Sequence, residues 1–416
     1  MYRRLPGGQR FASTSACPSA QRSGRPALSR LEGGATSVPP DRWWNAFTSK
    51  AACFQANVLY SSIMTNAHIA HQRLFHQHLA LPNFQKPGDV VAWFGAVQAQ
   101  DYLGALWAVG LRMPDASEAA IEQAIAAGVI VRTHPMRGTW HFVAAADIHW
   151  LLALMAPRNI ARNAAWYRQL ELDDATLAAS SAVFARALQG GKQLTRRELA
   201  AALEQTGIST AGLRLTFLLS RAEIEGIICS GARRGKQFTY ALLDEMVPAP
   251  RTLAREEAVA ELVRRYFTSH GPATVQDFVW WSSLTTADAR AGLDVVKSHL
   301  TRQVIDGQTY WLAPSTPAAP ADPPTAYLLP PYDEYTVAYT DRSAVLDPAY
   351  AEQTRNGIFS PIIVVDGQIV GVWSRAFKKN AVVITTNRFI PLSEVQEQAL
   401  AAARNRYSRF IGLPAE

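Results

Sequence analysis

Two glutamines, Gln98 and Gln100, interrupt an apolar stretch of the sequence (90–111) at a spacing of two. A buried amide without hydrogen-bond partners costs about 1–3 kcal/mol, so a pair of amides kept in such a stretch needs a reason. Residues two apart lie on the same side of an extended or tightly turned segment and on opposite sides of a helix. If both amides serve one site, we expect the preceding helix, 89–97, to end near Val97.

A neutral amide can orient reacting groups, although it is a poor general base. Hydrolysis of an ordinary N-glycosidic bond usually needs a carboxylate to support the oxocarbenium-like transition state and to activate water. A base that already carries a positive charge, such as an N7- or N3-alkylated purine, leaves without being protonated. Two amides that orient water and sugar are compatible with hydrolysis at such a base, and Asp101 keeps a carboxylate within reach.

A second interpretation of the glutamines is purely structural. Gln98 and Gln100 would cap helix ends and satisfy backbone groups, as hydrogen-bonded core amides commonly do. The residue pattern alone leaves both interpretations open.

The elements around the glutamines form a unit of helices followed by a pair of strands, and this unit occurs three times. Three such units in series, similar in order and length, are typical of tandem winged-helix domains. Thr195 and Glu198 predict a capping box, and Asp306-Gly307 predicts a hairpin turn. The expected helices are 68–79, 89–97, 103–111, 117–127, 146–170, 174–188, 195–204, 210–225, 254–269, 274–281 and 285–299. The expected hairpin strands are 129–133, 138–143, 227–230, 238–242, 301–305 and 308–312.

A different pattern follows a stretch with five prolines in thirteen residues, 314–326, which predicts a linker. Alternating runs predict short strands, and Ser393 predicts the cap of a final helix that ends near residue 411. The expected strands are 335–339, 361–365, 369–373 and 381–385. We therefore expect an α+β, mainly helical fold with three winged-helix domains and a small C-terminal β-barrel-like domain.

The expected domain boundaries follow these patterns. The units are an N-terminal extension (1–63), a first winged helix with the glutamines and a long helix (64–172), a second (173–250), a third (251–313), the linker (314–326) and the β-domain (327–416). The extension is rich in Ser, Gly and Pro and predicts disorder, and its Arg- and Ser-rich composition resembles an organellar transit segment. We favour Met64 as the start of the functional protein, because ordered patterning begins after it.

Composition limits the possible functions. The formal charge is +7, but residues 1–63 hold eight Lys/Arg against two Asp/Glu, which leaves 33 against 32 for the rest. Any affinity of the folded part for DNA must therefore come from local patches. One cysteine lies beyond residue 63, which excludes a disulfide framework or Cys-based metal site and fits a reducing, cytoplasmic compartment. Long apolar runs and the phosphate-loop, dinucleotide-binding and zinc-protease signatures are missing, so we expect no membrane span, metal or cofactor.

Two hairpins carry basic and aromatic residues that could contact DNA. The first combines arginines with an aromatic wedge, which suits a protein that grips and distorts a duplex. The second has cations beside a glycine at its tip, where they can approach phosphates. The alternative interpretations are that Trp140 and Phe142 are core residues that face the helices, and that the second tip is merely a soluble hairpin tip. The candidates are Arg132, Arg137, Trp140 and His141 in the first hairpin, and Arg233, Arg234 and Lys236 in the second.

The sequence resembles the bacterial winged-helix alkylpurine DNA glycosylases related to AlkZ, over nearly all of 66–412. The order and spacing of several short motifs carry this resemblance. They are Arg73-Leu74, Val97-Gln98-Ala99-Gln100-Asp101, Arg137-Gly138-Thr139-Trp140-His141-Phe142, Leu329-Pro330-Pro331-Tyr332-Asp333-Glu334-Tyr335, Asp341-Arg342 and Gly371-Val372-Trp373.

The resemblance implies that Gln98 and Gln100 are both catalytic, because that family carries Gln, a small or aliphatic residue, then Gln. A sister branch carries Asp at the second position, where this chain has Gln100. The implied reaction is monofunctional hydrolysis, in which water attacks C1′, frees an alkylated base and leaves an abasic site. Some members also unhook interstrand crosslinks.

The expected partner is double-stranded DNA with alkylated purines, bound by a monomeric bacterial protein associated with the nucleoid. The alternative, from another functional class, is a winged-helix transcriptional regulator that binds DNA without catalysis. A regulator predicts a sequence-specific, usually two-fold-symmetric operator and a dimer. Asp333, Asp341 and Arg342 are expected either at the site or in an ion-pair network at the junction with the β-domain.

Overall fold

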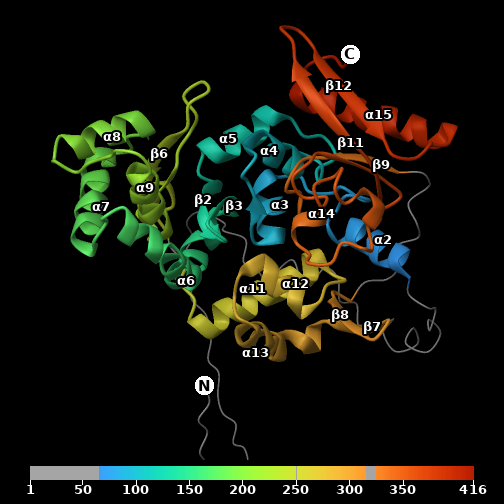
Figure 1. The fold of residues 1–416 in the computed structure, drawn as a ribbon, viewed down its shortest axis with the longest axis horizontal. Coiled ribbons are helices and arrows are strands. Elements are labelled where there is room, and N and C mark those ends of the chain that lie inside the picture. Colours follow the sequence, from blue (N-terminus) through green and yellow to red (C-terminus); the bar gives the residue numbers. More distant parts are fainter. Residues whose placement is uncertain (1–64, 250, 315–324) are drawn as a thin grey trace, which may run out of the picture. The chain divides into compact units, whose positions relative to one another are not determined.

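The computed structural model describes residues 65–249, 251–314 and 325–416 (Figure 1). Residues 63–416 form one compact unit. The interpretations of the N-terminal extension, and of most of the linker, lie outside the described residues. The predicted boundaries between winged-helix domains stay predictions.

The first part of the described chain places a small sheet against four helices. The helices are α2 (Asn66–His76), α3 (Pro87–Phe94), α4 (Tyr102–Gly110) and α5 (Glu118–Ala126), and the strands are β1 (Val97–Gln98), β2 (Ile130–Met136) and β3 (Thr139–Ala144). The strand order is β1-β3-β2, and all neighbours are antiparallel. The short strand β1 joins the hairpin because Val97 pairs with Phe142 and Gln98 with His141.

Helix α3 ends before the expected Val97. Gly95 takes a φ of 79°, which stops the helix and releases the chain into β1. Gln98 is then buried (6% exposed), whereas Gln100 is exposed. The two amides therefore differ in burial, because the chain turns toward solvent between β1 and α4.

The long helix α6 (Ile148–Gln169) connects the first group of helices and strands to two further groups, which follow in the expected order. Thr195 forms the predicted capping box in the second group. The second group contains α7 (Asp174–Leu188), β4 (Leu194–Thr195), α8 (Arg196–Glu204), α9 (Arg214–Ile224), β5 (Ile228–Ser230), β6 (Thr239–Leu242) and α10 (Leu243–Met246). The third contains α11 (Arg255–His270), α12 (Val275–Ser282), α13 (Thr286–Val296), β7 (Thr301–Ile305) and β8 (Gln308–Leu312).

The C-terminal part is an open sheet, and the expected barrel-like closure is wrong. Its elements are β9 (Ala326–Leu329), α14 (Glu334–Val337), β10 (Ile362–Val365), β11 (Gln368–Phe377), β12 (Val382–Arg388) and α15 (Glu394–Ile411), in strand order β12-β11-β10-β9. Among the described residues, β9 and β12 remain at opposite edges. The C-terminal residues cover the β12 edge, where Val382 N–H donates to Pro414 O at 2.9 Å.

The expected strand at 335–339 is instead the short helix α14. The five residues 335–339 are all buried, so their alternating pattern does not mark one buried and one exposed face of a strand. The Asp333 carboxylate accepts a hydrogen bond from Tyr335 N–H at 2.9 Å and so caps the helix. Arg112 holds the same carboxylate through two bonds of 2.9 Å.

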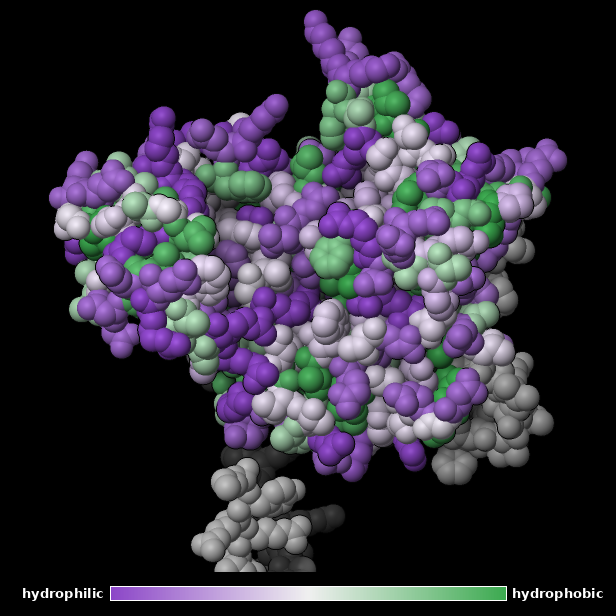
Figure 2. All heavy atoms as spheres, viewed as in Figure 1, coloured by the Kyte–Doolittle hydropathy of each residue, from purple (hydrophilic) through white to green (hydrophobic). Residues whose placement is uncertain are grey.

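One hydrophobic core joins the first helices to the C-terminal sheet, although they are far apart in the sequence. Trp107 from α4 packs against Tyr407 and Phe410 from α15, with ring centroids about 5 Å apart. None of the described helices is long and apolar enough to span a membrane. The face shown in Figure 2 is covered mostly by hydrophilic side chains.

Candidate active site

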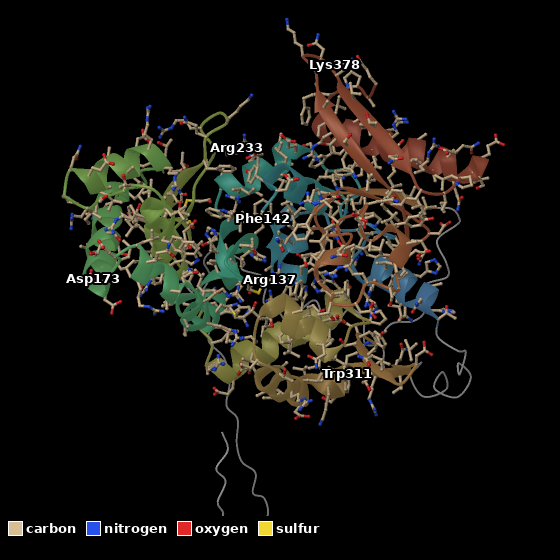
Figure 3. The ribbon with its side chains drawn as sticks, viewed as in Figure 1. Arg137, Phe142, Asp173, Arg233, Trp311 and Lys378 are labelled. Carbon is tan, nitrogen blue, oxygen red and sulfur yellow. The ribbon has the colours of Figure 1, made fainter. Side chains whose placement is uncertain are left out.

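Gln98 is held on two sides by charged groups from distant parts of the chain. The Arg137 guanidinium donates to Gln98 Oε1 at 2.6 Å, and the Gln98 backbone N–H donates to Glu334 Oε1 at 2.9 Å. Arg137 also donates to Trp281 O at 2.8 Å, at the end of α12. Figure 3 shows Arg137 between the β2–β3 hairpin and helices α11 and α12.

A two-residue turn presents Arg137 to Gln98. Met136 pairs with Thr139, and the intervening Arg137 and Gly138 have φ values of 56° and 67°. These positive values fit a type I′ turn, whose twist matches the flanking strands. A left-handed arginine costs of order 1 kcal/mol, and the three hydrogen bonds of its guanidinium, to Trp281 O, Gln98 Oε1 and His141 Nε2, offset that cost.

The donors around the glutamines fix how both amides are oriented. Arg137 can only donate, so the Gln98 atom that it contacts is the oxygen. The Trp140 backbone N–H donates to Gln100 Oε1 at 3.3 Å, which fixes the second amide in the same way. Neither Nε2 group has a hydrogen-bond partner among the described residues. Both amides therefore keep their N–H donors available for a substrate or a water.

His141 is fully buried and neutral. Its Nδ1 lies 2.9 Å from Thr139 O, which can only accept, so Nδ1 carries the proton and Nε2 accepts from Arg137 at 3.2 Å. Burial, together with the charge of Arg137, lowers the pKa of His141 to about 3. A neutral imidazole in this place orients Arg137 without adding charge to the site.

Glu334 contacts the backbone of Gln98, and the sequence analysis did not assign this residue to the site. Its second oxygen contacts Trp281 Nε1 at 2.9 Å and His270 Nε2 at 3.2 Å. Burial alone would raise the pKa of Glu334, but His270, Arg137 and the Gln98 N–H hold it below its ordinary value. Burial lowers the pKa of His270, so the pair consists of a carboxylate and a neutral imidazole. The sequence signal that could have found Glu334 is its place beside Asp333 in the motif 329–335.

Arg132 and Trp140 support the backbone next to Gln100. Arg132 is buried and donates to Ala99 O at 3.2 Å, and its guanidinium lies 3.9 Å from the centre of the Trp140 ring. The His134 ring lies 3.9 Å from the same ring, centroid to centroid. Trp140 is half-buried rather than a free wedge. The predicted DNA contacts of Arg132, Trp140 and His141 stay predictions, and burial of Arg132 and His141 favours a positioning role for both.

The cations of the second hairpin lie at its tip as expected, but two of them have internal partners. Arg233 pairs with Glu122 at 2.8 Å, and Arg234 pairs with Glu198 at 3.0 Å. Lys236 is exposed and has no ion-pair partner among the described residues. Figure 3 shows Arg233 on the β5–β6 loop, well apart from Arg137.

Several other charged residues have structural contacts. Asp101 caps α4, where it accepts from Gly104 N–H at 3.2 Å. Arg112 and Asp333 form a buried ion pair at the junction with the C-terminal sheet, which matches one of the two alternatives given for Asp333. Arg342 donates to Thr336 O at 3.0 Å, and Asp341 accepts from Ser343 N–H at 2.8 Å. Within the described ranges, no group of three or more His, Cys, Asp or Glu side chains could hold a metal ion.

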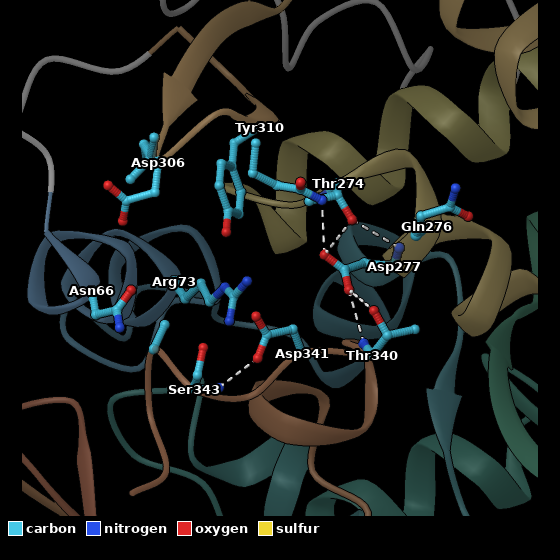
Figure 4. Close-up of a pocket in the computed structure, with 13 residues that line it drawn as sticks. Asn66, Arg73, Thr274, Gln276, Asp277, Asp306, Tyr310, Thr340, Asp341 and Ser343 are labelled. Atoms are coloured by element: carbon cyan, nitrogen blue, oxygen red, sulfur yellow. Dashed lines mark hydrogen bonds between the residues drawn. The ribbon is translucent and has the colours of Figure 1, made fainter. Parts of the chain in front are cut away.

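A polar cavity of about 450 Å³ lies apart from the two glutamines (Figure 4). Arg73, Asp277, Tyr310 and Asp341 are among the residues that line it. The Arg73 guanidinium lies 3.5 Å from the centre of the Tyr339 ring and donates to Pro272 O at 3.1 Å. Because neither glutamine lines this cavity, we place the candidate active site at the Gln98–Arg137 contact instead.

Comparison with known proteins identifies the family. The model of the AlkZ-like DNA glycosylases matches residues 91–410, which include both glutamines, Arg137 and Glu334. The chain belongs to the AlkZ-like DNA glycosylase family. As a member it is an enzyme, a DNA glycosylase, and the alternative of a regulator without catalysis is not supported.

Two comparisons agree with the AlkZ-like assignment. An interstrand DNA cross-link repair glycosylase of Streptomyces sahachiroi is 26% identical over 353 residues, which cover 80% of this chain and 94% of the relative. The solved structure of the DNA glycosylase AlkZ from the same organism matches with a TM-score of 0.70 and 23% identity, covering 85% of this chain and 99% of that one. The latter likeness supports the fold.

Proposed function

We propose that this enzyme hydrolyses the N-glycosidic bond of cationic N7- and N3-alkylated purines in double-stranded DNA, with Gln98 and Gln100 as its catalytic residues. The observation that carries the proposal is the orientation of the two amides. Both oxygens accept hydrogen bonds from the protein, and both Nε2 groups remain available. The nearest acidic neighbour in sequence, Asp101, caps a helix.

The chemistry suits a base that is already a good leaving group. The C1′–N bond breaks, and its electron pair leaves with the base and neutralises the positive charge of that base. Water forms the new C1′–O bond and releases a proton to solvent, which leaves an abasic sugar. Because neither glutamine can protonate a leaving group or take up a proton, their contribution is to orient water and sugar through hydrogen bonds.

Arg137 and Glu334 support this chemistry as positioning residues. Arg137 holds the Gln98 oxygen, while Glu334 holds the Gln98 backbone N–H. A fixed amide needs less reorganisation when the substrate binds, which is the general benefit of a preorganised site.

We further propose that crosslinked DNA is a substrate, because the curated relative is named for repair of interstrand crosslinks. We also propose three winged-helix domains in a monomeric, cytoplasmic protein. The order of the three groups of helices and hairpins supports the domain assignment.

The test is release of 7-methylguanine from a duplex that contains N7-methylguanine. Gln98→Ala and Gln100→Ala should each lower the single-turnover rate by about 10²-fold, the typical loss for a transition-state hydrogen-bond donor. Gln189→Ala, an exposed glutamine after α7, is the matched control and should keep the rate. Undiminished release by both active-site variants would remove the assignment of these residues, and absence of release by the unaltered chain would remove the substrate class.

A further inference from the structure

Two arginines on α6, Arg158 and Arg162, form an exposed pair of like charges. They are four residues apart, so they lie one turn apart on the same face of the helix. Neither has an acidic partner within ion-pair distance among the described residues. Partial burial, and then the charge of Arg158, lower the pKa of Arg162. Like charges at this spacing destabilise a helix slightly, so the pair gains energy when an anion binds between them.

Arg162, one turn of α6 beyond Arg158, connects this pair to the candidate active site. Arg162 donates to Ser283 Oγ at 3.1 Å, just beyond the end of α12, and Arg137 donates to Trp281 O at the same helix end. The charge of Arg162 also lowers the pKa of Arg137, after the larger effect of burial. Between the two arginines, Asn159 donates to Pro135 O at 2.7 Å, which fixes this turn of α6 against the β2–β3 hairpin.

The arginines first expected to bind DNA are engaged elsewhere in the fold. Arg132 contacts Ala99 O, and Arg233 and Arg234 pair with glutamates. Arg137 bonds Gln98. DNA glycosylases bind a polyanion, and phosphate contacts provide most of the position and affinity in such complexes. Arg158 and Arg162 differ from these arginines, because both are exposed and neither forms an ion pair among the described residues, so their guanidinium groups can contact a phosphate.

We propose that Arg158 and Arg162 form a phosphate-binding subsite that takes a DNA backbone phosphate close to the nucleotide whose glycosidic bond is broken. Two guanidinium groups present forked donors that match phosphate oxygens. The subsite fixes the register of the duplex, so that the alkylated nucleotide meets Gln98. Its position relative to the reaction rests on the proposed catalytic role of Gln98.

The test measures binding of the full chain to an undamaged duplex as a function of salt. The double variant Arg158→Gln with Arg162→Gln should bind more weakly and should lower the slope of log K against log salt by about 0.9 if both arginines share one phosphate. Arg290→Gln, an exposed arginine of α13 without an ion pair in the described chain, is the control and should leave the slope unchanged. The double variant Arg158→Lys with Arg162→Lys should retain most of the slope, because it keeps both charges.

Base release separates this proposal from the catalytic one. On N7-methylguanine DNA, Arg158→Gln with Arg162→Gln should need several-fold more enzyme for a half-maximal single-turnover rate, while the rate at saturating enzyme stays close to that of the unaltered chain. A salt slope of the Arg158→Gln/Arg162→Gln double variant equal to that of the unaltered chain would overturn the subsite. An equal decrease of the slope in Arg290→Gln would overturn it as well. Because binding to undamaged DNA involves no reaction, that result does not depend on whether Gln98→Ala retains activity. A thermal midpoint equal to that of the unaltered chain checks the fold of each variant.

Discussion

At the scale of single residues, the balance of charge around Gln98 is the main feature of the candidate site. His141 and His270 are neutral because burial lowers the pKa of both. Glu334 stays ionised and faces the positive charge of Arg137. The charges next to the amide of Gln98 therefore balance, and the amide itself supplies hydrogen bonds without transferring protons.

The buried histidines predict how stability depends on pH. The folded pKa of His141 is about 3 and that of His76 about 4, both below the ordinary 6.5. In the unfolded chain these histidines take up protons below pH 6.5, while in the folded chain they do not. Stability is therefore full above pH 6.5 and falls on acidification, by up to about 1.4 kcal/mol per pH unit for each histidine until the folded pKa is reached.

Urea unfolding at pH 7, 6, 5 and 4.5 measures this effect. In His141→Gln the decrease over this range should be smaller than in the unaltered chain, because one of the contributing histidines is gone. Equal pH slopes for the two proteins would contradict the buried, neutral state of His141.

At the scale of elements, the β2–β3 turn connects backbone geometry to Gln98, the proposed catalytic residue. Gly138 has a φ of 67°, and a Cβ atom added at this position would have no heavy atom within 4 Å. Gly138→Ala should therefore cost about 1 kcal/mol from backbone strain alone. A shifted turn also moves Arg137 away from Gln98, so the single-turnover rate of base release should fall by about tenfold or more.

The second hairpin offers a matched control for that prediction. Gly235 has a φ of 63° and equally open surroundings, but it lies in the β5–β6 loop, away from Gln98. Gly235→Ala should lower the free energy of unfolding by a similar amount and leave base release at saturating enzyme unchanged. If both variants slow the reaction equally, the turn has no special link to the site.

At the scale of the whole molecule, the C-terminal part contributes a side chain to the candidate active site. Glu334 from α14 contacts Gln98 of β1 and Trp281 of α12, so three distant segments meet at one carboxylate. The ion pair between Arg112 and Asp333 fixes α14 in this place, and both side chains are almost fully buried.

Removal of the charge of Asp333 tests this arrangement. Asp333→Asn should destabilise the protein by about 3–5 kcal/mol, because it leaves Arg112 buried with an unpaired charge. Unfolding by denaturant measures the loss, and Asp294→Asn provides the control, since the pair of Asp294 with Lys297 is largely exposed and contributes little. A loss for Asp333→Asn no larger than that of the control would show that the junction does not depend on this pair.

The sequence by itself determined most helices and hairpins, the capping residues and the two glutamines, because hydrophobic periodicity, caps and turn residues are local signals. The sequence pattern did not predict that residues 334–337 are helical, because α14 depends on the contact of its cap Asp333 with Arg112, which lies far away in the sequence. The spacing of Gln98 and Gln100 in an apolar stretch singled them out and the resemblance implied a catalytic role, yet no pattern indicated which atoms of their amides accept hydrogen bonds from the protein.

Only the tertiary structure decided that question. Arg137 comes from a turn and Glu334 from the C-terminal part, and their contacts with Gln98 span sequence separations of 39 and 236 residues. Periodicity reports which face of an element is buried, but it carries no information about which distant side chain meets that face. Burial likewise keeps His141 neutral and places the guanidinium of Arg132 against Ala99 O. The proposed phosphate contacts near the site are therefore those of Arg158 and Arg162.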